Sequence, residues 1–324
     1  MLGKDPRLKL ALAEWAEIAP QLGLVGADFK SKVIWQKDEP ERSHIVVRLK
    51  GKRKLILKRI FKAPDDSDHL GTVQAQQGVF ERLAEQQKAH APEVLYCNDD
   101  GTLVVMVEAS GKTLNDHLSA GRPHAQMLRR SGAWLAAFHK TMPTEQRTYQ
   151  SKYMVAHVSR MGDAVLEGAL NVPLPDLFIA SCAKIPQIAE TVSDQQTTSA
   201  VKHGDFNLRN ILLGPDGETG LDFKSTSTAP VGFDIARLLM DYAEMFQSKT
   251  DLQPGAVLSD ATLESFFDGY DLVGRDDPSV QFVPFVQLLN DWRLIPTNPM
   301  LRSWRQVARM EAIEALARNA FGFT

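Results

Sequence analysis

The chain has 324 residues, of which 44% are hydrophobic and 24% are charged, and its formal net charge is −3 at pH 7. This length favours two lobes or domains over one, and the composition supplies enough apolar side chains for a full core. The nearly balanced charge excludes the strongly basic composition of many nucleic-acid-binding proteins and gives no reason to expect a membrane surface as a partner.

The sequence also carries no sign of export. No apolar run is long enough to span a bilayer, and Glu14 and Glu17 interrupt the first apolar segment, which argues against a signal peptide. Cys97 and Cys182 lie far apart and lack the spacing of a metal site. Buried thiols in a reducing compartment are therefore expected rather than a disulfide, and the sequence predicts a cytoplasmic protein.

The N-terminal part is predicted to hold a helix followed by strands. An apolar stripe over Leu8–Ile18 indicates a helix that ends at Pro20. Lys32–Gln36 and Ile45–Leu49 then have the composition of strands. A third strand is predicted over Lys54–Phe61, because its apolar residues alternate as in a half-buried strand.

The chain then changes from strands to helices. Thr72–Gln86 places its apolar residues on one helical face. Pro92–Leu95 and Leu103–Val107 are typical of two more strands, so we expect a five-stranded antiparallel sheet in this part of the chain. His139, in the first of the later helices, is expected to be a satisfied core histidine. Those later helices are predicted over residues 125–139, 154–176, 177–192, 235–246 and 302–321.

The segment Val201–Asp222 combines His203, Asp205, Asn210 and Asp222. A short apolar run, a Gly-Pro-Asp-Gly turn and a second apolar stretch separate the last two of these residues. Two short strands joined by that turn would place Asn210 and Asp222 at neighbouring strand ends, with Asp205 in the loop just before them.

This arrangement suits phosphoryl transfer from MgATP. Such a reaction needs a carboxylate and an amide oxygen for the metal, and a second carboxylate that orients the attacking hydroxyl and takes its proton. Each residue alone would be better explained as part of a polar loop. Four such residues in register favour a phosphoryl-transfer site.

The spacing of His203, Asp205 and Asn210, with a later Asp-Phe, resembles the catalytic loop and metal-binding aspartate of protein kinases. His-Gly-Asp resembles the aminoglycoside phosphotransferase and choline kinase branch of that superfamily. The resemblance implies that Asp205 is the catalytic base, that Asn210 and Asp222 hold Mg²⁺, and that His203 braces the loop. Asp234, which also starts a predicted helix and could cap it, matches a family aspartate that supports the catalytic loop.

The same resemblance assigns nucleotide-binding residues. Lys58 matches the strand lysine that grips the α- and β-phosphates, although a surface lysine in a basic patch is the simpler explanation of that residue alone. The segment Lys37–His44 corresponds to the loop that covers the phosphates, but it contains no glycine. Ser43 in this loop could donate to a phosphate or be a plain turn serine. Glu108 opens the interlobe linker Glu108–Gly111, whose main chain would bind adenine.

One position departs from the family. The helix over Thr72–Gln86 normally supplies a glutamate that pairs with the strand lysine, and the apolar pattern places Gln76 there. Glu81, the nearest alternative, lies five residues on and is rotated by about 140° around the helix. A glutamine can hydrogen-bond Lys58 but cannot form the ion pair.

We therefore expect an α+β, protein-kinase-like fold with two lobes. Residues 1–108 would form a small nucleotide-binding lobe with a five-stranded antiparallel sheet, and residues 109–324 a larger, mainly helical lobe for catalysis and acceptor binding. The cofactors would be ATP and Mg²⁺. No nucleic-acid or membrane partner is expected, and the sequence does not specify an oligomeric state.

The expected activity is transfer of the γ-phosphoryl group to a hydroxyl of a sugar, amino sugar, amino alcohol or aminoglycoside. Asp-Phe-x₆-Pro-x₂-Phe-Asp-Ile-Ala, starting at Asp222, also resembles cell-wall amino-sugar kinases, which favours a sugar or amino sugar. Gln76 leaves open a nucleotide-binding pseudokinase scaffold without turnover, although the metal and base residues argue against it. A protein kinase is disfavoured, because no activation segment with an Ala-Pro-Glu end follows Asp222.

Overall fold

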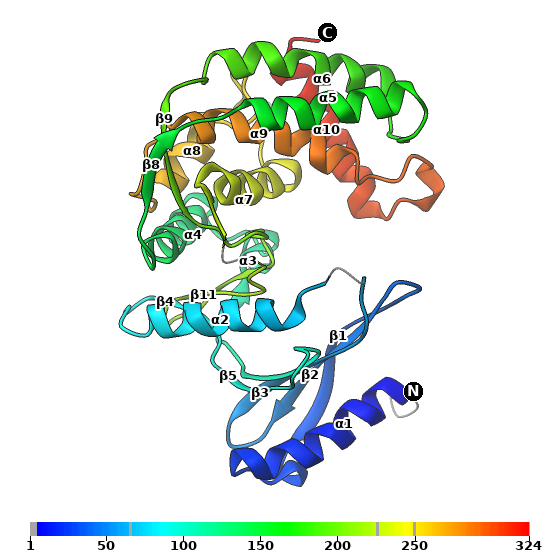
Figure 1. Ribbon diagram of the computed structural model, residues 1–324, viewed down its shortest axis with the longest axis vertical. Coiled ribbons are helices and arrows are strands. Elements are labelled where there is room, and N and C mark those ends of the chain that lie inside the picture. Colours follow the sequence, from blue (N-terminus) through cyan, green and yellow to red (C-terminus); the bar gives the residue numbers. More distant parts are fainter. Residues whose placement is uncertain (1–4, 65–66, 225–226, 249–250, 324) are drawn as a thin grey trace. The chain divides into compact units, whose positions relative to one another are not determined.

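The computed structural model describes residues 5–64, 67–224, 227–248 and 251–323. The chain divides into two compact units, coloured along the sequence in Figure 1. The first unit comprises Met1–Gly111 and Gly214–Ser225, and the second comprises Lys112–Leu213 and Thr226–Thr324. The division after Gly111 lies close to the predicted boundary after residue 108. The return of Gly214–Ser225 to the first unit was not expected from the sequence.

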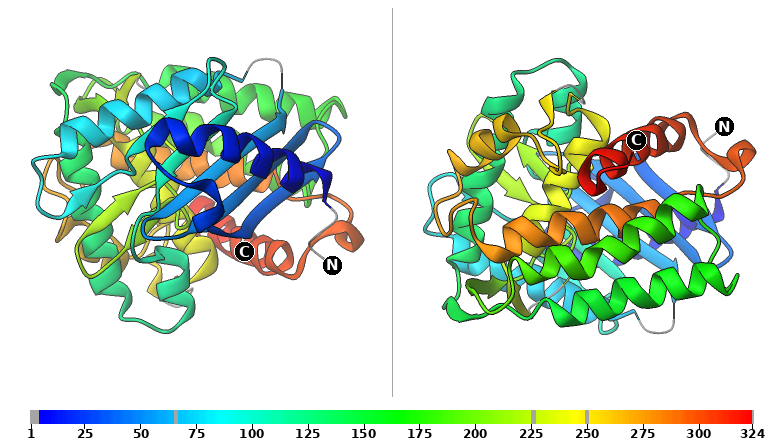
Figure 2. Two further views of the ribbon diagram at one scale, coloured as in Figure 1. Left: turned by 90° about the horizontal axis from the view of Figure 1, so that it is seen from below. Right: turned by 90° about the horizontal axis from the view of Figure 1, so that it is seen from above.

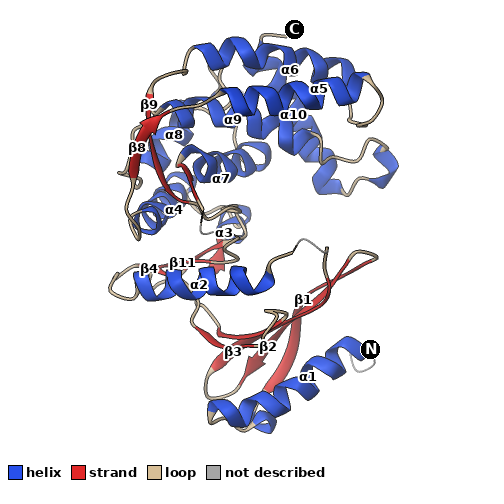
Figure 3. Ribbon diagram, viewed as in Figure 1, coloured by secondary structure: helices blue, strands red, loops and turns tan. Residues whose placement is uncertain are grey.

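The first unit is built on the predicted five-stranded antiparallel sheet, drawn red in Figure 3. Its strand order is β1-β2-β3-β6-β5. The strands are β1 (Lys30–Glu39), β2 (Arg42–Lys50), β3 (Lys54–Lys62), β5 (Val94–Cys97) and β6 (Leu103–Val107).

Helix α1 (Pro6–Ile18) covers one face of this sheet. Trp15 and Ile18 turn inward and pack with alternate residues of the strands, because side chains two apart on a strand share a face. The buried cluster they join contains Ala11, Ala19, Ile45, Val47, Leu49, Leu55, Leu57, Leu103 and Val105. Figure 2 shows α1, in dark blue, lying across the strands.

The long loop expected over Lys37–His44 does not exist, and this prediction was wrong. Strands β1 and β2 continue through that segment, and only Pro40 and Glu41 connect them. The physical reason is cross-strand pairing, which places Glu39 opposite Arg42 and so brings unlike charges together at the end of the ladder.

Helix α2 and the short strands β4 and β11 also belong to the first unit. Helix α2 (His69–Leu83) begins earlier than predicted, because the Asp68 carboxylate accepts a hydrogen bond from the Gly71 amide and caps the helix. Strand β4 (Ala89–His90) pairs in parallel with β11 (Glu218–Gly220), which ties the returning segment to this unit.

The second unit is mainly helical, as predicted. Helices α7 and α9 pack against each other, as do α5 and α6, whose long green ribbons lie side by side in Figure 2. The region predicted as helix over residues 154–176 is interrupted after Leu166, and a new helix starts at Pro175. The helices are α3 (Leu114–Ser119), α4 (His124–His139), α5 (Lys152–Leu166), α6 (Pro175–Glu190), α7 (Gly232–Met245), α8 (Asp260–Phe267), α9 (Pro278–Trp292) and α10 (Trp304–Phe321).

Short strands precede and follow the polar loop in the segment Val201–Asp222. A three-stranded sheet has the order β12-β9-β8, and β10 pairs with β7. These strands are β7 (Lys112–Thr113), β8 (Glu145–Thr148), β9 (Gln196–Val201), β10 (Ile211–Leu213) and β12 (Thr228–Pro230). The loop from residue 202 to residue 210 therefore starts and ends on hydrogen-bonded strands. Among the described helices, none has the length and apolarity needed to cross a membrane.

Candidate active site

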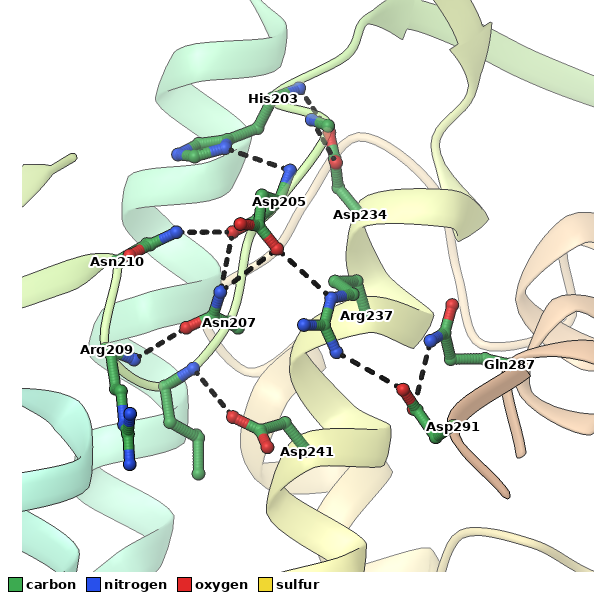
Figure 4. A network of polar contacts seen from close by, with 12 residues as sticks. His203, Asp205, Asn207, Arg209, Asn210, Asp234, Arg237, Asp241, Gln287 and Asp291 are labelled. Atoms are coloured by element: carbon green, nitrogen blue, oxygen red, sulfur yellow. Dashed lines mark hydrogen bonds and ion pairs between the residues drawn. The ribbon is translucent and has the colours of Figure 1, made fainter. Parts of the chain in front are cut away.

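The loop between β9 and β10 is held from within by Asp234, in the first turn of α7. The Asp234 carboxylate accepts hydrogen bonds from the His203 amide at 2.7 Å and from the Gly204 amide at 3.0 Å (Figure 4). Gly204 has φ +83°, a conformation that glycine adopts without a side-chain clash. Asp234 thus binds the loop main chain instead of capping its own helix, where Val231 is the N-cap.

Asp234 is itself fixed by a buried histidine. His139 Nε2 lies 3.2 Å from Asp234 Oδ2, and His139 Nδ1 lies 2.8 Å from the Tyr270 hydroxyl. Burial alone would raise the pKa of Asp234, but hydrogen bonding to His139, the nearby imidazoles and the His203 amide lower that pKa overall. The carboxylate is therefore an anion at neutral pH, and His139 is a satisfied core histidine, as expected.

The Asp205 side chain is oriented by two donors. Its Oδ1 accepts from Asn207 Nδ2 at 3.1 Å and from Arg237 Nε at 3.3 Å (Figure 4). The Asp205 main-chain carbonyl accepts from Asn210 Nδ2 at 2.9 Å. Asp205 and Asn210, five residues apart, are therefore joined directly. The carboxylate and the amide are both held in defined orientations.

A chain of charged groups continues from Arg237 into the helical core. Arg237 Nη1 lies 3.7 Å from Asp291 Oδ1, and Arg309 Nη2 lies 3.7 Å from the same oxygen. Burial raises the pKa of Asp291 despite these two guanidinium groups. Asp241, which also pairs with Arg309, accepts a hydrogen bond from the Leu208 amide of the loop.

Sequence reasoning missed these supporting residues. Arg237 and Asp241 stand at polar positions of α7, three and seven residues after Asp234, on the helical repeat of 3.6. From that spacing, the sequence could have indicated that these three side chains share one face of α7 and support the loop. Asp291 and Arg309 come from distant parts of the chain, and no local pattern connects them.

His203 braces the loop through its buried ring. The ring is fully buried and contacts the rings of Trp134, Phe138 and Phe206, with centroid separations of 6.0, 5.9 and 5.5 Å. Its Nδ1 lies 3.4 Å from the Asp205 amide, which donates to it. The histidine thus connects the apolar core to the backbone of Asp205.

The first unit contributes a lysine–aspartate pair. Lys58 Nζ on β3 lies 3.0 Å from Asp222 Oδ1. Asp222 adopts φ +56°, in the left-handed region, and the next residue, Phe223, is fully buried. Holding a residue other than glycine there costs about 1–3 kcal/mol, and such strain concentrates at functional sites. The buried phenylalanine therefore anchors a strained, exposed aspartate.

Gln76 does not bind this lysine. Its amide nitrogen donates to the Pro92 carbonyl at 3.3 Å and lies 3.8 Å from the Met106 sulfur. The hydrogen bond from Gln76 to Lys58 that the sequence allowed is thus not formed, since the amide satisfies a buried carbonyl instead. Glu81 accepts from Gln77 Nε2 on the surface of α2, away from Gln76 as its helical position predicted.

Two other predicted nucleotide contacts have partners within the first unit. The Ser43 hydroxyl accepts from Arg7 Nη1 at 3.3 Å and lies 3.4 Å from Asp38 Oδ1. The Glu108 amide donates to the Lys54 carbonyl at 3.0 Å, and the Glu108 carboxylate lies 2.7 Å from Arg48 Nε. Their roles in nucleotide binding stay predictions, and the geometry does not favour the one made for Ser43.

Within the described ranges, no group of three His, Cys, Asp or Glu side chains forms a metal site. Asp222 belongs to the first unit and Asn210 to the second. The Asp222 carboxylate already faces a cation, the Lys58 ammonium. Asn210 uses its amide nitrogen on Asp205, so its amide oxygen is the atom suited to a metal. Both are the hard oxygen donors that Mg²⁺ prefers, and they fit this ion.

The profile of the phosphotransferase enzyme family matches residues 38–276, and the chain belongs to this family. The match spans both units and includes Lys58, the loop and Asp234. The protein is therefore a phosphotransferase. A search of curated proteins found no match to the sequence.

Solved structures with the same fold cover nearly the whole chain. A choline/ethanolamine kinase family protein from Mesorhizobium loti is 14% identical, with a TM-score of 0.60 and coverage of 96% of this chain and 94% of that one. A GDP complex of aminoglycoside 2'-phosphotransferase-IIIa is also 14% identical, with a TM-score of 0.60 and coverages of 97% and 99%. A glucosamine kinase is 15% identical, with a TM-score of 0.54 and coverages of 95% and 78%. These similarities confirm the protein-kinase-like fold.

Proposed function

We propose that the protein transfers the γ-phosphoryl group of MgATP to a hydroxyl of a small molecule. The observation that carries this proposal is the pairing of Asp205 with Asn210 in a loop whose backbone is fixed by Asp234. A base and a metal ligand held in fixed orientations suit a reaction whose catalysis depends mainly on positioning and on neutralising charge.

In this proposal each residue has one task. Asp205 orients the acceptor hydroxyl and takes its proton. Asn210 and Asp222 hold Mg²⁺, which when bound neutralises charge on the phosphates. Lys58 steadies the α- and β-phosphates. Its ammonium now pairs with Asp222, with 30% of the side chain exposed, so an incoming phosphate can reach it.

The main chain of Glu108–Gly111 would bind the adenine ring. The Glu108 amide already donates to Lys54, so the remaining main-chain groups of that linker are the ones proposed to contact the base. A cytoplasmic location, where ATP is abundant, completes the proposal.

The proposed acceptor is a sugar, amino sugar, amino alcohol or aminoglycoside. Family membership supports a small hydroxyl acceptor, and the three similar structures carry the names of a choline/ethanolamine kinase, an aminoglycoside phosphotransferase and a glucosamine kinase. Among these classes we favour the sugars and amino sugars, because of the Asp-Phe-x₆-Pro-x₂-Phe-Asp pattern that ends at Asp234.

The test is ADP release from MgATP by the purified protein with a panel of these acceptors. Acceptor-dependent release that disappears in Asp205→Asn would establish the function and identify the acceptor class. A failure of MgATP to bind at all would contradict the assignments of Lys58, Asn210 and Asp222.

The second candidate is a nucleotide-binding scaffold without turnover. The observation that favours it is Gln76, whose amide is directed to the Pro92 carbonyl, so that the usual partner of the lysine is missing. A protein of this kind would gain thermal stability from MgATP and release no ADP with any acceptor of the panel.

A further inference from the structure

The hairpin of β1 and β2 presents two different faces. On β2, Ser43 and Ile45 point toward α1, since Ile45 lies in the core cluster with that helix. On β3, Arg59 is opposite Ile45 and pairs with Glu14 of α1. Residues at the alternate positions of both strands therefore point to the other face of the sheet.

His44 and Lys58 share that other face. Val46 is opposite Lys58 in the antiparallel register, and His44 is two residues before Val46. The pairing of His44 with Ile60 agrees with this assignment, because Ile60 is two residues after Lys58. A half-buried imidazole thus lies on the sheet face that bears the nucleotide-binding lysine.

The His44 ring is held by Trp35. A register shift between Val33 and Trp35 places Trp35 opposite Val46, on the same face. The two rings lie 4.3 Å apart between centroids at an interplanar angle of 31°. Trp35 is 48% exposed, so its packing on the histidine is a surface contact and not part of the core.

The end of the hairpin is clamped from the opposite face. Arg7 of α1 donates to the Lys37 carbonyl and to the Ser43 hydroxyl, both at 3.3 Å, and lies 3.0 Å from Asp38 Oδ1. Lys62 of β3 donates to the Pro40 carbonyl in the turn. These contacts fix the backbone that carries His44.

Cations surround His44. Burial first, and then the charges of Lys58 on β3, Lys37 on β1 and Arg42 on β2, lower the pKa of His44, while Asp222 in the returning segment opposes this effect. The imidazole is therefore neutral in the free protein at pH 7. Anionic phosphates on this face would favour its protonated form.

We propose that His44, oriented by Trp35, binds the phosphates of the nucleotide on the sheet face that bears Lys58. This inference rests on the proposed function. A fixed hairpin with an imidazole donor would replace the glycine-rich loop that the sequence lacks. Glycine loops offer backbone amides to phosphates, whereas here a side chain would supply the donor.

The test compares two residues on opposite faces of the β1–β2 hairpin, since Ser31 is exposed and lies opposite Leu49 on the face toward α1. His44→Ala and Ser31→Ala are titrated with MgAMP-PNP and with adenosine by calorimetry, without any acceptor. The His44→Ala change should weaken MgAMP-PNP binding about ten- to a hundredfold, as expected for loss of a hydrogen bond to a charged group, and leave adenosine binding unchanged. Ser31→Ala should alter neither affinity. His44→Gln, which keeps a donor, should recover part of the loss.

A second readout separates phosphate binding from a structural role. Binding of MgAMP-PNP to the wild type should take up protons at pH 7 to 8, visible as a binding enthalpy that varies with the ionisation enthalpy of the buffer. Affinity should fall as the pH rises, because the protonated imidazole is the form that binds phosphate. His44→Gln should remove both effects.

The outcomes distinguish this inference from the proposed function. If the wild type binds MgAMP-PNP and His44→Ala binds it equally well, with no proton uptake in the wild type, the role of His44 is overturned and the proposed function stands. Equal losses for adenosine and MgAMP-PNP would also overturn it, since they would indicate general damage to the sheet. If the wild type binds no nucleotide, the proposed function itself fails.

Discussion

The two groups of candidate residues, one in each unit, are stabilised in different ways. The loop around Asp205 is fixed by buried groups, with Asp234 only 3% exposed and His203 fully buried. The pair in the first unit is open, with 30% of the Lys58 side chain and 56% of the Asp222 side chain exposed. In the proposed function, the protein therefore sets the geometry of Asp205 in advance, whereas Lys58 and Asp222 are accessible to a ligand.

The energetic consequence is a large difference in what each part contributes to stability. Removing one partner of a buried charged pair typically costs about 3–5 kcal/mol. An exposed ion pair contributes about 0–1 kcal/mol, because solvent screens it. Mutations in the two regions should therefore separate loss of folding from loss of ligand binding.

The largest expected effect is on the rate, from Asp205→Asn. The amide can still accept from Asn207 and Arg237 but cannot take the proton of the acceptor. Turnover should fall about 10²–10⁴-fold, the usual contribution of a general base, while MgATP binding and the melting temperature stay close to wild type. Steady-state kinetics and thermal unfolding measure both, with Asp271→Asn, at an exposed aspartate, as the control. Unchanged turnover would remove Asp205 from the mechanism.

Replacement of Asp234 should have the largest effect on stability. Asp234→Ala leaves the His203 and Gly204 amides without their acceptor and His139 without its partner. We expect a loss of about 3–5 kcal/mol in the free energy of unfolding, with a fall in turnover because the loop is no longer fixed. Urea unfolding at pH 7 measures the first effect. A change below 1 kcal/mol would show that the loop is held by other contacts.

The contribution of Asp234 to the free energy of unfolding should depend on pH in a defined direction. The folded-state pKa of Asp234 is lowered from 3.8, so the carboxylate contributes stability that is fully present above the unfolded-state pKa. That contribution is lost as the pH falls through the folded-state value. The stability difference between wild type and Asp234→Asn, measured by urea unfolding, should therefore shrink as the pH falls below about 4.

The fold and the polar loop could be predicted from the sequence because both depend on patterns of residues that are close together in the chain. Alternation over residues 45–49 and 54–61 identified the strands around Lys58, and the spacing of His203, Asp205 and Asn210 identified the loop. The hairpin connection was mispredicted, because the charged residues at its end resemble a loop until their cross-strand partners are known. The pairing of Glu39 with Arg42 supplies that information in the structure.

The support of the loop required the three-dimensional structure. Arg237 is connected to Asp291 on α9 and, through it, to Arg309 on α10, across a long sequence separation. The hydrophobic periodicity of a sequence cannot predict contacts between residues so far apart in the chain. The same limit applies to Gln76, since the Pro92 carbonyl that it binds could not be identified from the pattern of α2.

Gln76 offers an intermediate test of the comparison, because it is a buried residue at the position where the family supplies the partner of the strand lysine. Gln76→Glu would place a carboxylate against the Pro92 carbonyl, removing a donor from a buried acceptor. We expect a loss of about 1–3 kcal/mol in the free energy of unfolding and no gain in turnover. Gln74→Glu, the same change at an exposed position of α2, should be neutral. Higher turnover in Gln76→Glu would instead show that the glutamate reaches Lys58.

The smallest effect on stability is expected at the open pair itself. Lys58→Met keeps the length and apolar stem of the side chain but removes the charge, and with it an ion pair that solvent already screens. The free energy of unfolding should change by less than about 1 kcal/mol, while MgATP affinity falls, because the phosphates lose their cation. Urea unfolding and nucleotide titration on the same preparation measure the two quantities. A large loss of stability with unchanged affinity would contradict this prediction. It would show that the Lys58–Asp222 pair stabilises the first unit and that other groups bind the ligand.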